Sequence, residues 1–191
     1  MPFGDHRIEV FETPGHTRGH IVYFVPGVKA AFVGDTLFAM GCGRPFEGSP
    51  AEMWDSLQKI LRWPDDTRIY CAHEYTLTNA QFALTVEPGN VALVARAREI
   101  AELRRAGRPT VPTVLALEKE TNPFLRPTSP ALARTIGLAD ADTVSVFART
   151  RELKDSMRRA GRSGEPAIGP ASSTRRHVRR CERRQPCAGA V

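Results

Sequence analysis

The hydrophobic pattern of this chain changes near residue 76, and this change constrains the fold more than any other feature. The first part holds short apolar runs bounded by turn-forming residues, a pattern that is typical of β-strands. These runs cover residues 7–12, 20–25, 29–34 and 67–72. The segment Pro26–Val28 separates two of them by a short Pro-Gly turn, which predicts a hairpin-like connection.

The second part lacks strand alternation and shows helical spacing instead. Apolar residues recur every three or four positions from Leu93 to Leu103, and Gly107 is a candidate helix end. Further helices are predicted at about 129–137 and 140–157. Before residue 76, only Ser49–Glu52 gives a helix signal, a capping box with proline at the first helical position. The pattern therefore predicts an α+β chain with a β-rich first part and an all-helical second part.

Charge is concentrated at the end of the chain. The net charge of the 191 residues is +6, yet residues 158–191 alone contain nine arginines and two glutamates. This segment is poor in large apolar residues, so we expect a disordered tail. His177, Cys181 and Cys187 within it could belong to a zinc site, but a fourth ligand is missing and we favour incidental residues. Nucleic-acid binding by the tail is a rival function, disfavoured because no aromatic residues lie between the arginines.

Other features restrict the class of protein. No apolar run approaches the ~18 residues of a membrane helix. The first ten residues do not read as a signal peptide, and the four cysteines are too scattered for a disulfide framework. We therefore expect a cytoplasmic monomer without a membrane partner.

Three polar clusters follow three of the predicted strands, where loops commonly carry functional residues. They are TPGHTRGH with His16 and His20, GDT with Asp35, and AHEY with His73. Two imidazoles and a carboxylate suit zinc or iron, and a carboxylate can bridge two cations. Each residue also has an ordinary structural interpretation, and His20 begins an apolar run. From residue types alone, the metal and the structural interpretations both stay open.

A resemblance favours the metal interpretation. The segments TPGHTRGH, FVGDTLFAMGCGRPFEG, IYCAHEYT, NPFLR and RELKD occur in this order between about residues 7 and 157. They resemble glyoxalase II, the hydroxyacylglutathione hydrolase family of the metallo-β-lactamase superfamily. The resemblance implies part of a metallo-β-lactamase αββα sandwich over 1–75 and a helical glutathione-binding domain over 76–157. Residues 158–191 would form the disordered tail.

The resemblance also implies roles for single residues. His16 would bind one metal, His73 a second, and Asp35 would bridge both and take part in catalysis with a metal-bound hydroxide. Zinc is the first expectation for both ions, with iron or manganese as alternatives. The implied substrate-binding residues are Arg44, Phe46, Tyr75, Arg151 and Lys154. His20 would be a structural residue.

The implied reaction converts S-D-lactoylglutathione and water to glutathione and D-lactate. A persulfide dioxygenase would share the fold, but the RELK segment favours the hydrolase. Phe46 departs from members that carry tyrosine at this position, because phenylalanine offers no hydroxyl group.

The motif THxHxDH of the family does not occur in this sequence. We therefore expect a chain that lacks the first half of the sandwich, with two protein ligands per metal ion and doubtful metal occupancy. The alternative function is an inactive remnant that at most binds glutathione.

Overall fold

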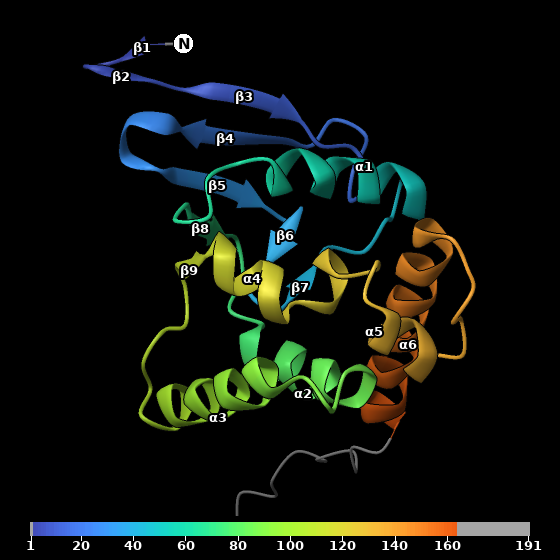
Figure 1. Ribbon diagram of the computed structural model, residues 1–191. Coiled ribbons are helices and arrows are strands. Elements are labelled where there is room, and N and C mark those ends of the chain that lie inside the picture. The colour runs from blue at the N-terminus through green and yellow to red at the C-terminus, as the bar shows by residue number, and fades with distance from the viewer. Residues whose placement is uncertain (1, 164–191) are drawn as a thin grey trace, which may run out of the picture.

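The computed structural model describes the backbone of residues 2–163 and the side chains of residues 4–159. Figure 1 shows the sheet on one side of the molecule and helices α2 and α3 at the opposite end. The strands are β1 (Pro2–Phe3), β2 (His6–Arg7), β3 (Glu9–Glu12), β4 (Ile21–Val25), β5 (Ala30–Gly34), β6 (Leu37–Phe38), β7 (Gly41–Cys42), β8 (Arg68–Cys71) and β9 (Thr113–Val114). The helices are α1 (Pro50–Leu61), α2 (Thr76–Val86), α3 (Val91–Arg105), α4 (Leu115–Thr121), α5 (Pro130–Thr135) and α6 (Thr143–Ser163), with 3-10 turns η1 (Pro26–Val28) and η2 (Pro123–Leu125).

The main sheet has the strand order β3-β4-β5-β8-β9. The β4–β5 hairpin turns through η1, as the Pro-Gly segment predicts. Strands β5 and β8 are parallel, and α1 forms the crossover between them. Parallel neighbours end at the same edge of a sheet, so the loops after β5 and β8 lie together.

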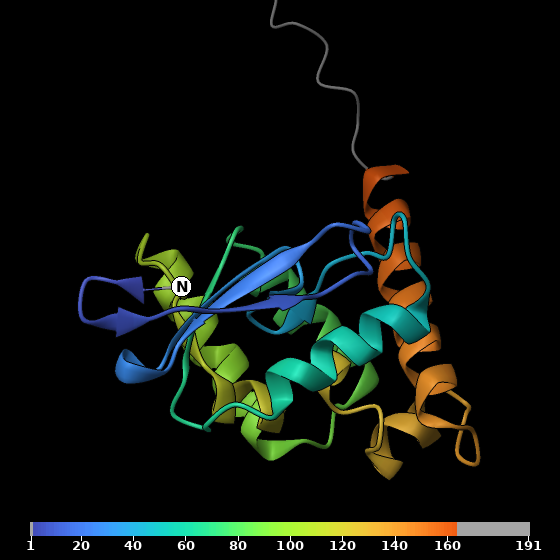
Figure 2. The same ribbon diagram turned by 90° about the horizontal axis from the view of Figure 1, so that it is seen from above.

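One apolar core joins the two parts of the chain. Helix α1 begins at the predicted capping box and buries Met53, Leu57 and Ile60 against the inner face of the sheet. Phe124 and Phe147 of the second part belong to the same core. Helix α6 packs against α1, as the view from above shows (Figure 2). The second part is therefore packed onto the first.

The sequence-based prediction of fold class is confirmed, with two differences in detail. The second part is not all-helical, because β9 pairs with β8 at the edge of the main sheet. A two-residue strand is too short to produce an alternating pattern. Helix α6 also continues to Ser163, beyond the predicted boundary at residue 157. The remainder of the predicted tail, with His177, Cys181 and Cys187, lies outside the described residues.

The small β6–β7 hairpin is held by buried polar groups of the second part. The backbone N–H of Met40 at its turn donates to the Glu118 carboxylate at 2.8 Å. The Asn122 side chain donates to the carbonyls of Phe38 and Gly41. Glu118 is fully buried and forms an ion pair with Arg96, which is also buried. This network attaches helices α3 and α4 to the hairpin.

The outer face of the sheet presents a row of apolar side chains. Val10 pairs with Tyr23, Tyr23 with Phe32, and Phe32 with Tyr70, so the row crosses four strands. The rings of Phe32 and Tyr70 stack at 5.1 Å, and Phe32 is 49% exposed. We call these four residues the outer apolar row.

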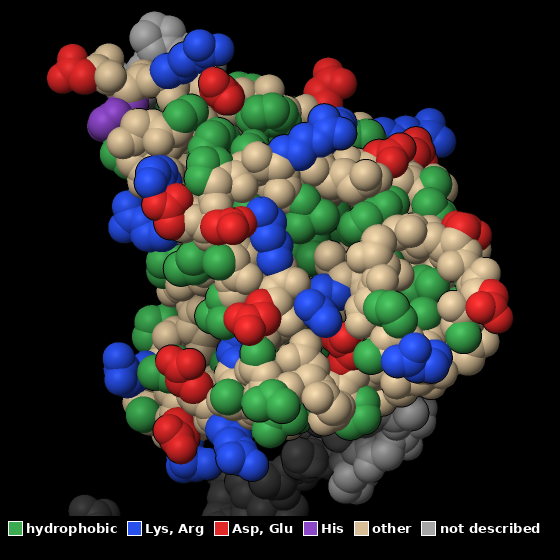
Figure 3. Space-filling view, viewed as in Figure 1, with side chains coloured by type: hydrophobic (Ala, Val, Ile, Leu, Met, Phe, Trp, Pro, Cys, Tyr) green, Lys and Arg blue, Asp and Glu red, His purple; other side chains and the backbone are tan. Residues whose placement is uncertain are grey.

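Acidic and basic side chains are intermixed on the face shown in Figure 3. Within residues 2–163, no helix combines the length and apolar character needed to cross a membrane.

Candidate active site

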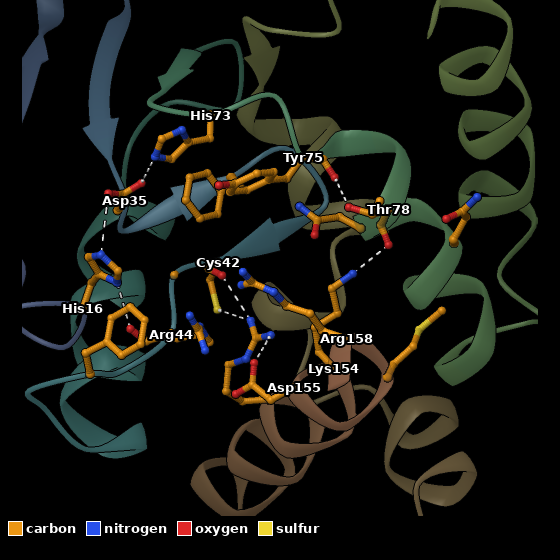
Figure 4. Close-up of a pocket in the computed structure, with 17 residues that line it drawn as sticks. His16, Asp35, Cys42, Arg44, His73, Tyr75, Thr78, Lys154, Asp155 and Arg158 are labelled. Atoms are coloured by element: carbon orange, nitrogen blue, oxygen red, sulfur yellow. Dashed lines mark hydrogen bonds and ion pairs between the residues drawn. The ribbon is translucent and has the colours of Figure 1, made fainter. Parts of the chain in front are cut away.

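The three predicted metal-site residues converge at one edge of the sheet. His16 lies in the loop between β3 and β4, Asp35 directly follows β5, and His73 follows β8. His16 Nε2 lies 3.6 Å from Asp35 Oδ2, and His73 Nε2 lies 3.4 Å from Asp35 Oδ1. Figure 4 shows Asp35 between the two imidazoles. We call this arrangement the His–Asp–His row.

The tautomer of His16 is set by the backbone. Its Nδ1 lies 2.9 Å from the carbonyl oxygen of Arg44, which can only accept a hydrogen bond. Nδ1 therefore carries a proton, and in the neutral ring Nε2 turns a lone pair toward Asp35. Metal-binding histidines typically donate their second N–H to a carbonyl or carboxylate in this way.

His20 holds the backbone of Asp35 by a hydrogen bond. Its Nε2 accepts the backbone N–H of Asp35 at 3.2 Å, and its Nδ1 lies 2.9 Å from the Thr36 hydroxyl. Burial and the neighbouring His16 lower the pKa of His20, which keeps the ring neutral and able to accept. The implied structural role of His20 agrees with these contacts.

Glycines allow the backbone to pack closely around Asp35. Gly34 adopts φ 50°, and a β-carbon there would lie 2.8 Å from His20 Nε2. A β-carbon at Gly43 would lie 2.0 Å from the Asp35 carbonyl oxygen. No larger residue fits at Gly43 without displacing the backbone of Asp35.

The residues of the His–Asp–His row fit divalent cations in donor type and spacing. Two ligands that each lie about 2.1 Å from a tetrahedral zinc are about 3.4 Å apart, which is close to both imidazole–carboxylate distances. Those distances are too long for good hydrogen bonds. Asp35 Oδ1 is also buried without a hydrogen-bond partner among the described residues, as expected for an oxygen suited to a cation.

The number of protein side chains available to each cation is smaller than in an ordinary catalytic metal site. Within the described range, no group of three or more histidine, cysteine, aspartate or glutamate side chains is arranged around one metal ion. His16 and His73 face different oxygens of Asp35, so a cation beside either histidine would have two protein ligands. A catalytic zinc ordinarily has three.

The row forms one end of a pocket of about 600 Å³. This volume lies in the usual range for a small-molecule site. The pocket runs from the sheet edge along β7 to helices α2 and α6 (Figure 4). All five of the predicted substrate-binding residues line it: Arg44, Phe46, Tyr75, Arg151 and Lys154.

Aromatic rings surround the histidines. Tyr75 stacks on His73 with ring centres 5.1 Å apart and is 49% exposed, so its hydroxyl is accessible. Phe46 lies 5.2 Å from His16, and the Arg44 guanidinium lies 4.3 Å from the Phe46 ring centre. Phe46 therefore offers an apolar surface and a support for Arg44.

The two predicted basic residues of α6 have different surroundings. Arg151 is buried, and donates to the Cys42 carbonyl at 3.1 Å and to the Asp155 carboxylate at 3.0 Å. Lys154 donates to the Thr78 carbonyl at 2.6 Å and lies over the Phe82 ring. Burial, and then the charge of Arg151, lower the pKa of Lys154 to about 8.

Sequence reasoning missed several residues of the pocket. Arg158 and Asp155 line it together with Phe38 and Asn79. Arg158 lies seven residues after Arg151, and this helical spacing could have identified it. The predicted domain boundary at residue 157 instead assigned Arg158 to the tail.

Comparisons with known proteins agree with this geometry. The family model of the metallo-beta-lactamase superfamily matches residues 1–73, and the model described as hydroxyacylglutathione hydrolase C-terminus matches residues 74–157. The hydroxyacylglutathione hydrolase of Maricaulis maris is 56% identical over 157 residues, which are 82% of this chain and 61% of that protein. The enzyme of the same name from Rhizobium etli is 55% identical over 155 residues, 81% of this chain and 60% of that protein.

This chain belongs to the hydroxyacylglutathione hydrolase family. It spans about 60% of the length of the curated relatives that it matches. The crystal structure of ETHE1 from Myxococcus xanthus aligns with a TM-score of 0.48 and 24% identity, over 85% of this chain and 56% of that one.

Proposed function

We propose that this hydroxyacylglutathione hydrolase chain hydrolyses the thioester bond of S-D-lactoylglutathione and related S-2-hydroxyacylglutathiones. Water adds to the thioester carbonyl, the carbon–sulfur bond breaks, and glutathione and a 2-hydroxy acid are released. The observation that carries this proposal is one continuous pocket, with the His–Asp–His row at one end and cationic side chains of α6 at the other. A glutathione thioester has a carboxylate at its glycine end and a reactive carbonyl at its sulfur, so it matches both ends.

In this proposal His16, Asp35 and His73 would hold two divalent cations, with zinc expected first and iron or manganese as alternatives. Bound cations would lower the pKa of a water molecule and polarise the thioester carbonyl group of the substrate. His20 and Gly43 keep the Asp35 backbone in place, and the Arg44 carbonyl fixes the His16 ring.

The remaining residues bind and orient the glutathione part. The accessible hydroxyl of Tyr75 can hydrogen-bond its peptide groups, and Arg44 adds a cation to the pocket lining. Phe46 offers an apolar contact surface beside His16. The leaving thiolate needs no strong acid, because a thiol has a pKa of about 8.5.

A second candidate function is glutathione binding without hydrolysis. It is favoured by the two ligands available to each cation, one fewer than an ordinary catalytic zinc has. The cytoplasmic location and the monomeric state stay predictions.

One experiment separates the two candidates. The purified chain is loaded with zinc, its metal content is measured, and loss of S-D-lactoylglutathione is followed by thioester absorbance. Zinc-dependent turnover supports the hydrolase. Saturable binding of S-methylglutathione without turnover supports the second candidate, and absence of both activities contradicts both.

A further inference from the structure

Two threonines contact Nδ1 of His20, whereas Nε2 of the same ring faces the backbone of Asp35. Thr13 directly follows β3, and Thr36 directly follows Asp35. Both threonines are fully buried, and neither lines the pocket. Their hydroxyl oxygens lie 3.0 Å apart. We call Thr13, His20 and Thr36 the hydroxyl cluster.

The contacts of His20 fix the position of its proton. The backbone N–H of Asp35 can only donate, and it lies 3.2 Å from Nε2, so Nε2 is the acceptor. The proton of the neutral ring is therefore on Nδ1. Nδ1 lies 2.9 Å from the Thr36 hydroxyl and 3.1 Å from the Thr13 hydroxyl. Both hydroxyls can accept this proton, so the surroundings of the ring select one tautomer.

The same reasoning gives a direction to every hydrogen bond of the hydroxyl cluster. Because Nδ1 is a donor, the Thr36 oxygen accepts from it and the Thr36 hydroxyl donates to Thr13 Oγ1 at 3.0 Å. The Thr13 hydroxyl then donates to the backbone carbonyl oxygen of His20 at 3.4 Å. The chain of hydrogen bonds begins and ends at His20. Each buried hydroxyl both accepts and donates, as buried polar groups generally do.

The opposite tautomer would disturb Asp35. With its proton on Nε2, the His20 ring would place one N–H group against another, since the Asp35 backbone N–H lies 3.2 Å away. A backbone donor that loses its acceptor is costly when it is removed from water. The backbone of Asp35 would have to move, and its two carboxylate oxygens would move away from His16 and His73.

We propose that Thr13 and Thr36 are positioning residues of the metal site. Their hydroxyls hold His20 in the tautomer with Nδ1 protonated, and His20 in turn fixes Asp35 between the two imidazoles. This inference rests on the proposed function for metal binding by Asp35. Neither threonine is among the residues that the sequence analysis assigned to the site.

The test removes both hydroxyls in the double variant Thr13→Val with Thr36→Val. Valine keeps the branched shape of threonine and offers no acceptor to Nδ1. In the metal-free chain labelled with ¹⁵N-histidine, NMR reports which ring nitrogen of His20 carries the proton. We expect a change from the single Nδ1–H tautomer to a mixture of both tautomers. Zinc affinity, measured by competition with a chromogenic chelator, should fall roughly tenfold, as for partners of metal ligands elsewhere.

Two further variants separate positioning from packing. Thr13→Ser with Thr36→Ser keeps both hydroxyls, so it should retain the tautomer and the zinc affinity of the unchanged chain. Thr67→Val is the matched control, because Thr67 is also fully buried and its hydroxyl has no hydrogen-bond partner among the described residues. It should change neither signal. Thr36→Val alone removes the nearer acceptor, and we expect a smaller change in the same direction.

The outcomes distinguish this inference from the proposed function. An unchanged His20 tautomer or an unchanged zinc affinity in the double valine variant would overturn the inference. Equal losses in the serine and valine variants would also overturn it, because the hydroxyls would then not be the cause. Failure of the unchanged chain to bind zinc would contradict the proposed metal site and this inference together. Zinc affinity that follows the tautomer, in a chain without S-D-lactoylglutathione hydrolysis, would support the inference and contradict the hydrolase.

Discussion

Asp35 turns its two carboxylate oxygens toward different imidazoles, so a single substitution affects both positions of the His–Asp–His row. Asp35→Asn replaces one oxygen by an NH₂ group and removes the charge. We expect zinc affinity to fall at least about tenfold, since even the partners of metal ligands have effects of that size. Metal content after gel filtration, by mass spectrometry, measures the change.

The control is Asp66→Asn. Asp66 forms an exposed ion pair with Lys29 and does not line the pocket, so this variant should retain zinc as the unchanged chain does. Equal zinc retention by Asp35→Asn would show that the row is not the metal site.

The lowered pKa of Lys154 predicts that anion binding and folding depend on pH in opposite directions. Its pKa is lowered to about 8 from 10.5, mainly by burial and by Arg151, against the opposing effect of Asp155. Anion binding needs the protonated amine, so affinity for S-methylglutathione should decrease as pH rises through about 8. Between about pH 8 and 10.5 the unfolded chain binds more protons, so the free energy of unfolding should rise with pH.

Calorimetry from pH 7 to 9.5 checks the first effect, and urea titration over the alkaline range checks the second. Lys154→Met should flatten both profiles. If Lys154→Met and the unchanged chain have the same pH profiles, the pH dependence belongs to another titratable group.

At the scale of elements, the second part of the chain determines the shape of the pocket wall. The β6–β7 hairpin carries Phe38 and Cys42 on that wall, and Glu118 and Asn122 hold its turn. Burial raises the pKa of Cys42 to about 11, so its thiol is a packing group of the wall.

Glu118→Ala would leave Arg96 as a buried charge without its carboxylate. We expect a loss of about 3–5 kcal/mol in the free energy of unfolding, typical of a broken buried ion pair. Urea unfolding followed by circular dichroism measures it. The matched control is Glu152→Ala in the exposed Arg149–Glu152 pair, for which a change within about 1 kcal/mol is expected. Similar losses in the two variants would contradict a special role for the buried network.

The elements differ in how far the sequence alone predicts them. The longer strands and helix α1 follow from apolar runs and the capping box of Ser49, since these signals are local. Strands β6, β7 and β9 have two residues each and depend on partners distant in the chain. The sequence places His16, Asp35 and His73 at strand ends, whereas their meeting depends on the parallel pairing of β5 with β8.

The residues of the candidate site, like the elements of the fold, are only partly predictable from the sequence. Residue types identify the row as a possible metal site, and the resemblance supplies the substrate-binding set. The commitment of Arg151 to Asp155 and Cys42 depends on packing between α6 and β7. No pattern along the chain contains that information.

At the scale of the whole molecule, the outer apolar row leaves a hydrophobic sheet face in water. Contiguous exposed apolar surface promotes association. Phe32→Thr places a residue with good strand propensity at the centre of the row. We expect lower binding of the dye ANS and less light scattering at high protein concentration, with S-methylglutathione affinity unchanged. Val91→Thr, at an exposed apolar residue of α3, is the control and should change neither signal.

The order of the site residues along the chain has a consequence for biosynthesis. His16, Asp35 and His73 leave the ribosome first, and Lys154 and Arg158 follow about 80 residues later, roughly 4–16 s at ordinary translation rates. During that interval the nascent chain can present the His–Asp–His row to cellular metal ions before α6 exists to complete the pocket. Under the proposed function, metal binding can therefore precede glutathione recognition.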